Sequence, residues 1–150
     1  MTGLEADEIR ERRKRLGVVF EQAPIRKTFG MELQYVHGDA VLQLPPNPNL
    51  SNYVGGVHGG VIATMLDIAG WFAVAPYYDE WLTTVEIHAR YLRPANETEV
   101  SAVGKALRAG KRIAMADMEV RTQNGDLVAV GSGTFAVTTK NLRAELNPEG

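Results

Sequence analysis

The sequence contains no cysteine, which excludes disulfides, thiolate nucleophiles and zinc sites built on cysteine. Neither charge sign dominates, because 16 basic and 18 acidic side chains leave the 150-residue chain with a net charge of -2. We therefore expect no long-range attraction to nucleic acid or to an acidic membrane. The sequence has no metal-ligand spacing, phosphate-binding loop or nucleophile elbow, so we expect neither a metal nor a cofactor. Catalysis would have to use carboxylates, histidine, hydroxyl groups or backbone amides.

The chain also lacks an export signal and a long hydrophobic run. Residues 4–15 are rich in charge, where a signal peptide would need an apolar core. The most apolar stretch, residues 59–75, is shorter than the roughly 20 residues of a membrane span and contains Asp67. We therefore expect a soluble, cytoplasmic protein that enters no membrane. Its length and its 45% of hydrophobic residues predict a single globular domain over residues 1–150.

The first part of the sequence predicts a helix, two strands and a loop. Residues 4–22 carry a thin apolar stripe, with acidic residues early and basic residues later, as the helix dipole favours. Strands are expected at residues 29–36 and 40–44, joined by a turn at 37–39. Residues 47–57 consist almost entirely of turn formers and predict a loop.

The second part predicts one apolar helix and then only strands. Residues 59–75 are apolar nearly all round a helix, so this helix must be covered on most of its sides. Four strands are expected at residues 83–92, 99–107, 113–122 and 127–137. Asn124 and Gly125 are a strong hairpin signal between the last two strands, and we expect all four to form an antiparallel meander.

This order predicts an α+β fold, in which a curled antiparallel sheet wraps around one long buried helix. The N-terminal helix is an addition to a core of about residues 29–138, and a short C-terminal tail follows. A doubly wound α/β fold would need repeated βαβ units, which the pattern lacks.

A glycine-rich segment leads into the buried helix and is the first candidate for chemistry. Gly59 and Gly60 would occupy the first helical turn, where backbone N–H groups have no partner within the helix. Glycine allows a ligand to approach these amides closely, and the helix dipole favours negative charge there. This is an oxyanion hole in outline. The alternative is a loop that needs flexible glycines to enter a crowded core.

Asp67 is the second candidate, because it interrupts a helix whose neighbouring residues are almost all apolar. Ionised carboxylates are rarely buried without a partner. Asp67 is therefore either a structural residue that caps or salt-bridges a strand residue such as Arg90, or a general base or nucleophile.

The spacing of these two candidates predicts a dimer. Nine residues separate His58 from Asp67, which is about 13.5 Å along a helix axis. The amides and the carboxylate of one chain are then too far apart to act on the same carbonyl group. If both are catalytic, Gly59 of one subunit must combine with Asp67 of another, in two equivalent sites across a two-fold axis.

These residues resemble a known family. Asn52, then His58-Gly59-Gly60, then Asp67 are similar to the motif of the hotdog-fold acyl-CoA thioesterases. The resemblance is strongest to the phenylacetate-degradation type and to its relatives that act on hydroxybenzoyl-CoA and fatty acyl-CoA. It extends over about residues 29–137 and includes the segment 90–95.

The resemblance implies a fold, a reaction and a set of roles. The Gly59 amide would polarise the thioester carbonyl, His58 would shape that corner, and Asp67 of the partner subunit would activate water or attack directly. Asn52 would contact the water or the thioester. Related enzymes often place a hydroxyl one turn after the acid or on the next strand. Trp71 stands one turn after Asp67 and has no hydroxyl, so we expect Thr84, in preference to Thr83, to supply it from the strand.

The turn at residues 108–112 is basic and has two interpretations. Together with Gly60, its side chains Arg108, Lys111 and Arg112 are expected to bind the substrate, by holding the phosphates of CoA. CoA is then part of the substrate and not a cofactor. The alternative is a solvated turn of no special function, and Arg90 and Arg93 are other candidates for phosphate binding or ion pairing.

Two other functions fit the resemblance less well. A hotdog hydratase or dehydratase acting on acyl thioesters has a different histidine loop and places its acid elsewhere. A non-catalytic module that binds acyl-CoA would gain nothing from the buried charge of Asp67. The family resemblance implies at least a homodimer and often a tetramer.

Overall fold

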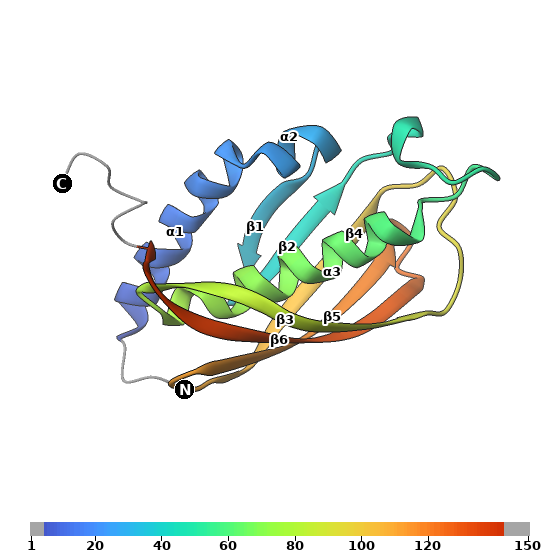
Figure 1. Ribbon diagram of the computed structural model, residues 1–150. Coiled ribbons are helices and arrows are strands. Elements are labelled where there is room, and N and C mark those ends of the chain that lie inside the picture. Colours follow the sequence, from blue (N-terminus) through green and yellow to red (C-terminus); the bar gives the residue numbers. More distant parts are fainter. Residues whose placement is uncertain (1–4, 143–150) are drawn as a thin grey trace.

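The computed structural model describes residues 5–142, which form three α-helices and a six-stranded sheet (Figure 1). The helices are α1 (Ala6–Gln22), α2 (Pro24–Phe29) and α3 (Gly59–Val74), with 3-10 turns η1 (Pro48–Leu50) and η2 (Ala75–Tyr77). The strands are β1 (Glu32–Val36), β2 (Asp39–Leu44), β3 (Glu80–Tyr91), β4 (Val100–Ala109), β5 (Ile113–Thr122) and β6 (Leu127–Asn141). Leu4 of the predicted helix and residues 143–150 of the predicted tail lie outside the described residues.

The sheet is antiparallel throughout, in the order β1-β2-β4-β5-β6-β3. The predicted four-strand meander is wrong in one connection, because β3 pairs with β6 and not with β4. The segment between β3 and β4, residues 92–99, is too long for a tight hairpin and contains Pro94. It carries the chain from the edge of the sheet to its centre. The predicted hairpin at Asn124 and Gly125 is confirmed, with Gly125 at a φ of +89°.

The start of the first strand was predicted too early. Residues 24–29 form the short helix α2, since Pro24 suits the first turn of a helix and Gly30 ends it in the left-handed conformation, at a φ of 76°. The first strand therefore begins at Glu32, and the tight turn at His37 and Gly38 joins it to β2 as predicted. β3 begins three residues before its predicted start, and β6 continues four residues beyond its predicted end.

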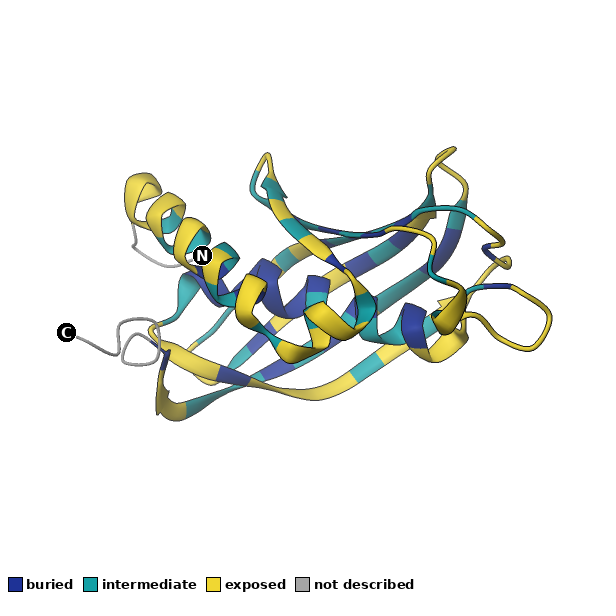
Figure 2. Cartoon of the chain, turned by 90° about the horizontal axis from the view of Figure 1, so that it is seen from above, coloured by how far each residue is buried: buried dark blue, intermediate teal, exposed yellow. Residues whose placement is uncertain are grey.

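The sheet curls around α3, as the sequence predicts for a hotdog fold (Figure 1). Gly104 of β4 allows the closest approach, because a Cβ atom there would lie only 2.1 Å from the carbonyl oxygen of Ala69 in α3. Buried residues, dark blue in Figure 2, gather where the helices and strands face one another. One hydrophobic core connects α1, α3 and the sheet.

Helix α3 is not covered on all sides. Its side chains at Ala63, Thr64, Asp67 and Ile68 are only half-buried and form one stripe along the helix. With η2, the helix is a continuous apolar segment of 19 residues, Gly59–Tyr77, which by length and composition could cross a membrane. In the fold most of this segment is buried, so it is the core helix of the domain. The cytoplasmic location stays a prediction.

Candidate active site

The start of α3 is held by the side chain of His58. His58 is the residue before the first helical turn, and its Nδ1 accepts a hydrogen bond of 2.9 Å from the Gly60 amide. Its own amide donates to the Leu50 carbonyl oxygen at 2.9 Å, which ties the loop before α3 to the turn η1. Because Nδ1 is an acceptor, the proton of the neutral imidazole lies on Nε2. His58 thus caps α3, and its role in catalysis stays a prediction.

Gly59 keeps its amide free for a ligand. Within residues 5–142, no hydrogen bond uses the Gly59 N–H group, whereas the Gly60 amide is occupied by His58. The Gly59 carbonyl oxygen accepts a hydrogen bond of 2.6 Å from the hydroxyl of Tyr91 at the end of β3. Of the two amides that the sequence suggests, Gly59 is thus the one available to an incoming carbonyl oxygen.

Asn52 organises the loop that precedes this corner. Its side-chain oxygen accepts hydrogen bonds from the amides of Val54, at 3.1 Å, and Gly56, at 3.0 Å. A Cβ atom at Gly56 would lie 2.8 Å from the side-chain oxygen of Asn96, so a larger residue there would displace that side chain. The side-chain nitrogen of Asn52 has no hydrogen bond within the described part of the chain, so the predicted contact with water or thioester would fall to it.

Asp67 lies on the half-buried stripe of α3 and pairs with Thr84 of β3. The Thr84 hydroxyl donates a hydrogen bond of 2.8 Å to Oδ1 of Asp67. Burial raises the pKa of Asp67 above the ordinary value of 3.8, and the hydroxyl of Thr84 lowers it in part. The structure thus brings together Asp67 and Thr84, the acid and the hydroxyl predicted from the sequence. The pairing of β3 with β6 is irregular between Thr84 and Glu86, and such bulges are frequent beside functional sites.

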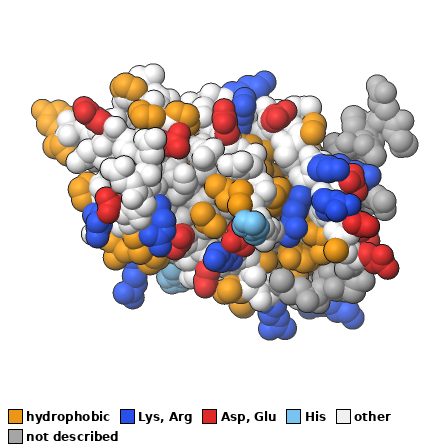
Figure 3. All heavy atoms as spheres, turned by 180° about the vertical axis from the view of Figure 1, so that it is seen from behind, with side chains coloured by type: hydrophobic (Ala, Val, Ile, Leu, Met, Phe, Trp, Pro, Cys, Tyr) orange, Lys and Arg blue, Asp and Glu red, His pale blue; other side chains and the backbone are white. Residues whose placement is uncertain are grey.

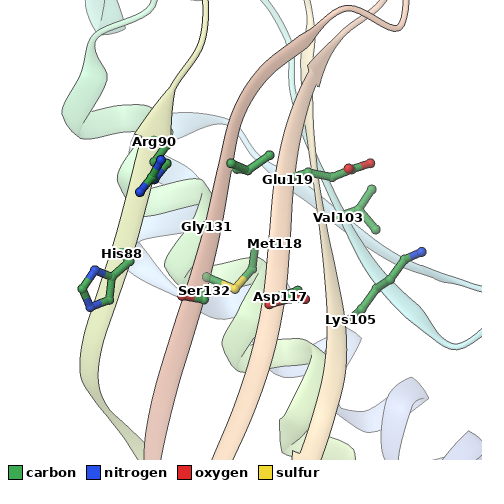
Figure 4. Close-up of a pocket in the computed structure, with 10 residues that line it drawn as sticks. His88, Arg90, Val103, Lys105, Asp117, Met118, Glu119, Gly131 and Ser132 are labelled. Carbon is green, nitrogen blue, oxygen red and sulfur yellow. The ribbon is translucent and has the colours of Figure 1, made fainter.

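The alternative partner for Asp67, Arg90, is wrong. Arg90 lines a hollow with His88, Val103 and Asp117, on the face of the sheet that points away from α3 (Figure 4). The other arginine considered, Arg93, lies 3.4 Å from Asp126 and forms an exposed ion pair.

Gly59 and Asp67 of one chain do not form one site. Eight residues of continuous helix separate them, which is about 12 Å along the axis of α3. An oxyanion donor and a base that serve one carbonyl must each lie about 3 Å from the reacting atoms. One carbonyl group therefore cannot be served by Gly59 and Asp67 of the same chain.

An apolar pocket of about 400 Å³ opens beside Asp67 and Thr84. Its walls come from the end of α1, the start of α2, α3 and the first half of β3. The side chains of Trp71 and Trp81 line the pocket, with ring centroids 4.9 Å apart. The sequence predicted Trp71 near the acid but gave no sign that the N-terminal helices would form a wall.

A hollow of about 490 Å³ lies on the outer face of the sheet (Figure 4). Its lining is mixed in charge: His88, Arg90 and Lys105 face Asp117 and Glu119. Figure 3, seen from behind, shows side chains of both charges scattered among hydrophobic ones. The pocket beside Asp67 is the better candidate, since it combines a half-buried carboxylate with an apolar lining.

The basic turn lies at the far end of the molecule from Gly59. Arg108, Lys111 and Arg112 are exposed at the β4–β5 connection, and the hydroxyl of Tyr78, just beyond α3, donates to Gly110 O at 2.8 Å. The turn thus sits near the C-terminal end of α3, whereas Gly59 begins that helix. Within residues 5–142 no three His, Asp or Glu side chains lie close enough to hold a metal ion.

Comparisons with known proteins relate the chain to enzymes. The family model described as Thioesterase superfamily matches residues 54–129, just over half of the chain. The chain is 29% identical to the medium/long-chain acyl-CoA thioesterase YigI of Escherichia coli K12, over 76% of the chain and 85% of YigI. It is 27% identical to the 1,4-dihydroxy-2-naphthoyl-CoA hydrolase of Listeria monocytogenes, over 77% of the chain and 97% of that enzyme.

The fold also matches that of solved structures. The Escherichia coli PaaI protein, from the phenylacetic acid degradation operon, superposes with a TM-score of 0.80. The match covers 88% of this chain and 96% of PaaI at 19% sequence identity, so it shows a shared fold and nothing about function. The expected arrangement, a curled sheet around one central helix with an added N-terminal helix, is confirmed.

Proposed function

The chain belongs to the thioesterase superfamily, and from this premise we propose that it hydrolyses acyl-CoA thioesters to a free acid and CoA. One observation carries the proposal: a half-buried carboxylate, Asp67, is hydrogen-bonded to Thr84 beside an apolar pocket, while the Gly59 amide at the start of the same helix has no hydrogen bond within the described residues. These are the acid, the hydroxyl and the oxyanion donor that acyl transfer requires.

Each active site combines Gly59 of one subunit with Asp67 of its partner. The distance of about 12 Å between them in one chain supports this arrangement, because two antiparallel copies of α3 would bring the two half-sites together. The half-buried stripe of α3 contains Asp67 and would be covered by the partner. The resemblance to hotdog enzymes further implies a tetramer, which stays a prediction.

The outer edge of β3 gives this dimer a second contact. Among the described residues β3 pairs only with β6, so the other edge of this 12-residue strand is not paired with a strand. Val85 on this strand is 58% exposed and Tyr91 is 51% exposed. Natural proteins rarely leave a long edge strand with apolar side chains open to water, which favours a partner there.

The reaction needs only groups of the chain, water and the substrate. The Gly59 N–H group donates to the carbonyl oxygen and stabilises the negative charge that develops on it. In one route Asp67 takes a proton from water, and the resulting hydroxide attacks the carbonyl carbon. In the other, the carboxylate attacks directly and water then hydrolyses the anhydride. In both routes the carbon–sulfur bond breaks, and the CoA thiolate leaves and is protonated.

Thr84 and Asn52 hold the nucleophile in these routes. The Thr84 hydroxyl keeps the Asp67 carboxylate in place and favours its ionised form. The side-chain nitrogen of Asn52, which has no hydrogen bond within the described residues, would donate to the water or to the thioester. Arg108, Lys111 and Arg112 would bind the phosphates of CoA, as the family resemblance implies.

A thiol-release assay tests the proposal. The wild-type protein should release CoA from at least one of acetyl-, octanoyl-, palmitoyl- and phenylacetyl-CoA. Asp67→Asn should lower kcat by roughly 100-fold or more, since general bases contribute about 100- to 10,000-fold. A hydratase would consume an unsaturated acyl-CoA without thiol release. If a folded wild-type protein binds these compounds but releases no thiol from any of them, the proposal is wrong.

Gly59 offers a matched pair of variants for the oxyanion donor. Proline is tolerated at the first helical position, and the extended backbone of His58, with a ψ of 137°, suits a residue before proline. Gly59→Pro therefore removes the N–H group without breaking the helix. Gly59→Ala keeps that group, and its Cβ atom would make only an ordinary contact of 3.7 Å with Tyr91. We expect the alanine variant to stay active and the proline variant to lose about 100-fold or more in kcat.

A further inference from the structure

The N-terminal helices complete a pocket that the catalytic groups do not need. Val19, at the end of α1, and Ile25, at the start of α2, line the apolar pocket beside Asp67. Both precede residue 54, where the match to the family model begins, and neither is hydrogen-bonded to Asp67 or Thr84. The wall that they form is therefore separate from the catalytic groups.

The opposite wall is rigid and aromatic. Trp71 lies one helical turn after Asp67, and its Nε1 donates a hydrogen bond of 2.8 Å to the carbonyl oxygen of Leu82. Phe72 packs edge-on against it, with ring centroids 4.8 Å apart, and the ring of Trp81 also packs against it, at 4.9 Å. A side chain locked by a hydrogen bond and two ring contacts gives a wall of fixed shape.

The chemistry of the pocket selects its occupant. Apart from Asp67 and two threonines, every side chain that lines it is hydrophobic. Its volume of about 400 Å³ falls in the range of small-molecule sites, about 300–1,000 Å³. A group that enters it must be apolar and must be attached to the atom on which Asp67 acts. In a thioester that group is the acyl chain, on the far side of the carbonyl from CoA.

We propose that this pocket binds the acyl group, and that Val19 and Ile25 set how large an acyl group fits. The inference rests on the proposed thioester hydrolysis and adds the substrate class to it: hydrophobic acyl groups well beyond acetyl in size. Acetyl would leave the pocket filled with water and gain little from it. A bulkier apolar acyl group displaces that water and contacts both tryptophan rings.

A pair of variants one residue apart on α1 tests this assignment. Val19→Phe places a larger side chain in the pocket, whereas Val18→Phe alters the neighbouring position, which is 56% exposed and does not line the pocket. We expect Val19→Phe to lower kcat/KM for octanoyl-CoA at least about tenfold, because small changes of volume in an apolar pocket have effects of this size. Its kcat/KM for acetyl-CoA should stay within about twofold of wild type, and Val18→Phe should match wild type with both substrates. Ile25→Phe repeats the test from α2.

Tryptophan fluorescence gives a second readout that does not depend on catalysis. The chain has two tryptophans, and both line this pocket, so their emission reports on it alone. Octanoate should shift the emission of the wild-type protein, acetate should not, and Val19→Phe should need at least about tenfold more octanoate.

The outcomes separate the two proposals. Absence of thiol release from every acyl-CoA refutes the proposed function. If octanoyl-CoA is hydrolysed but octanoate leaves the emission unchanged, the pocket is not the acyl site. Equal losses with acetyl- and octanoyl-CoA in Val19→Phe, or no loss with either, likewise overturn the assignment of Val19 as a determinant of acyl size.

Discussion

The hydrogen bond between His58 and Gly60 predicts that His58 acts as a positioning residue. His58→Ala removes the Nδ1 acceptor and leaves the Gly60 amide without its partner in the chain. Loss of such a helix cap costs about 1 kcal/mol, in a range of about 0.5–2 kcal/mol. For a chain of this size 1 kcal/mol corresponds to about 2–4 °C in Tm. Thermal unfolding followed by circular dichroism, at one protein concentration, measures this loss.

The same substitution should lower kcat more than it raises KM. Without its cap, the first turn of α3 no longer holds the Gly59 N–H group on the carbonyl oxygen. A misplacement of about 1 Å can cost about 100-fold, so we expect a loss of roughly 10- to 100-fold in kcat. The effect falls on kcat, because the hydrogen bond to the oxyanion strengthens in the transition state.

His58→Asn distinguishes positioning from proton transfer. Asparagine is among the best helix caps, and its side-chain oxygen can accept from the Gly60 amide. This variant should recover the Tm of the wild type and most of its kcat. If instead it is as stable as wild type but as slow as His58→Ala, the imidazole takes part in proton transfer or substrate contact, and the positioning role is refuted.

Four further predictions follow from single contacts. Thr84→Val removes the hydroxyl that lowers the pKa of Asp67, so the acidic side of the pH profile of kcat/KM should move to higher pH. Thr84→Ser keeps a hydroxyl and should show the wild-type profile. If the profile of Thr84→Val does not move, Asp67 does not control the rate. Burial raises the pKa of Asp67 above its ordinary value of 3.8, so the folded state binds a proton at Asp67 more tightly than the unfolded state does. The stability of the wild type therefore falls as the pH rises from 3.8 through the pKa of Asp67 in the folded state. Urea unfolding should therefore show Asp67→Asn gaining stability relative to wild type between acidic and neutral pH, and a constant difference would contradict this. Gly104→Ala should destabilise the fold by about 1–3 kcal/mol or more, since its Cβ would meet the backbone of Ala69, whereas Gly17→Ala, with open space around it in α1, should stabilise by about 0.5–1 kcal/mol. Replacing Lys111 and Arg112 by glutamine should raise KM for an acyl-CoA by roughly twofold to fivefold per charge and leave the matching acyl-pantetheine thioester unaffected; equal effects on both would remove the turn from the CoA site.

Local patterns were sufficient to predict most of the elements of this fold. The run of apolar residues after Gly60 identified the central helix, and Asn124-Gly125 identified a hairpin, because both signals depend on neighbouring residues. The pairing of β3 with β6 could not be predicted in this way. It joins segments about 50 residues apart and depends on how the connection at residues 92–99 crosses the end of the sheet.

The candidate site likewise has a part that the sequence predicts and a part that only the structure shows. Asp67 can be identified from the sequence, because a carboxylate is rarely found among the apolar residues of a buried helix. The role of Thr84 is predicted from the family resemblance. The hydroxyl of Tyr91 on Gly59, and the wall formed by Val19 and Ile25, come from segments far from the motif in sequence. Apolar residues in α1 and α2 are equally compatible with plain core packing, so only their placement beside Asp67 assigns them to a pocket.

Subunit complementation tests most directly whether the active site is shared between two chains. Asp67→Asn and Gly59→Pro are each inactive in this account, because each damages one half of every site. A mixed dimer has one site with Gly59 of the first chain and Asp67 of the second, both intact. After subunit exchange of equal amounts, with mixed dimers verified by mass spectrometry, we expect about a quarter of wild-type activity, since half of the dimers carry one intact site of two. If verified mixed dimers of the two folded variants stay as inactive as either variant alone, Gly59 and Asp67 do not meet across an interface, and the shared site is wrong.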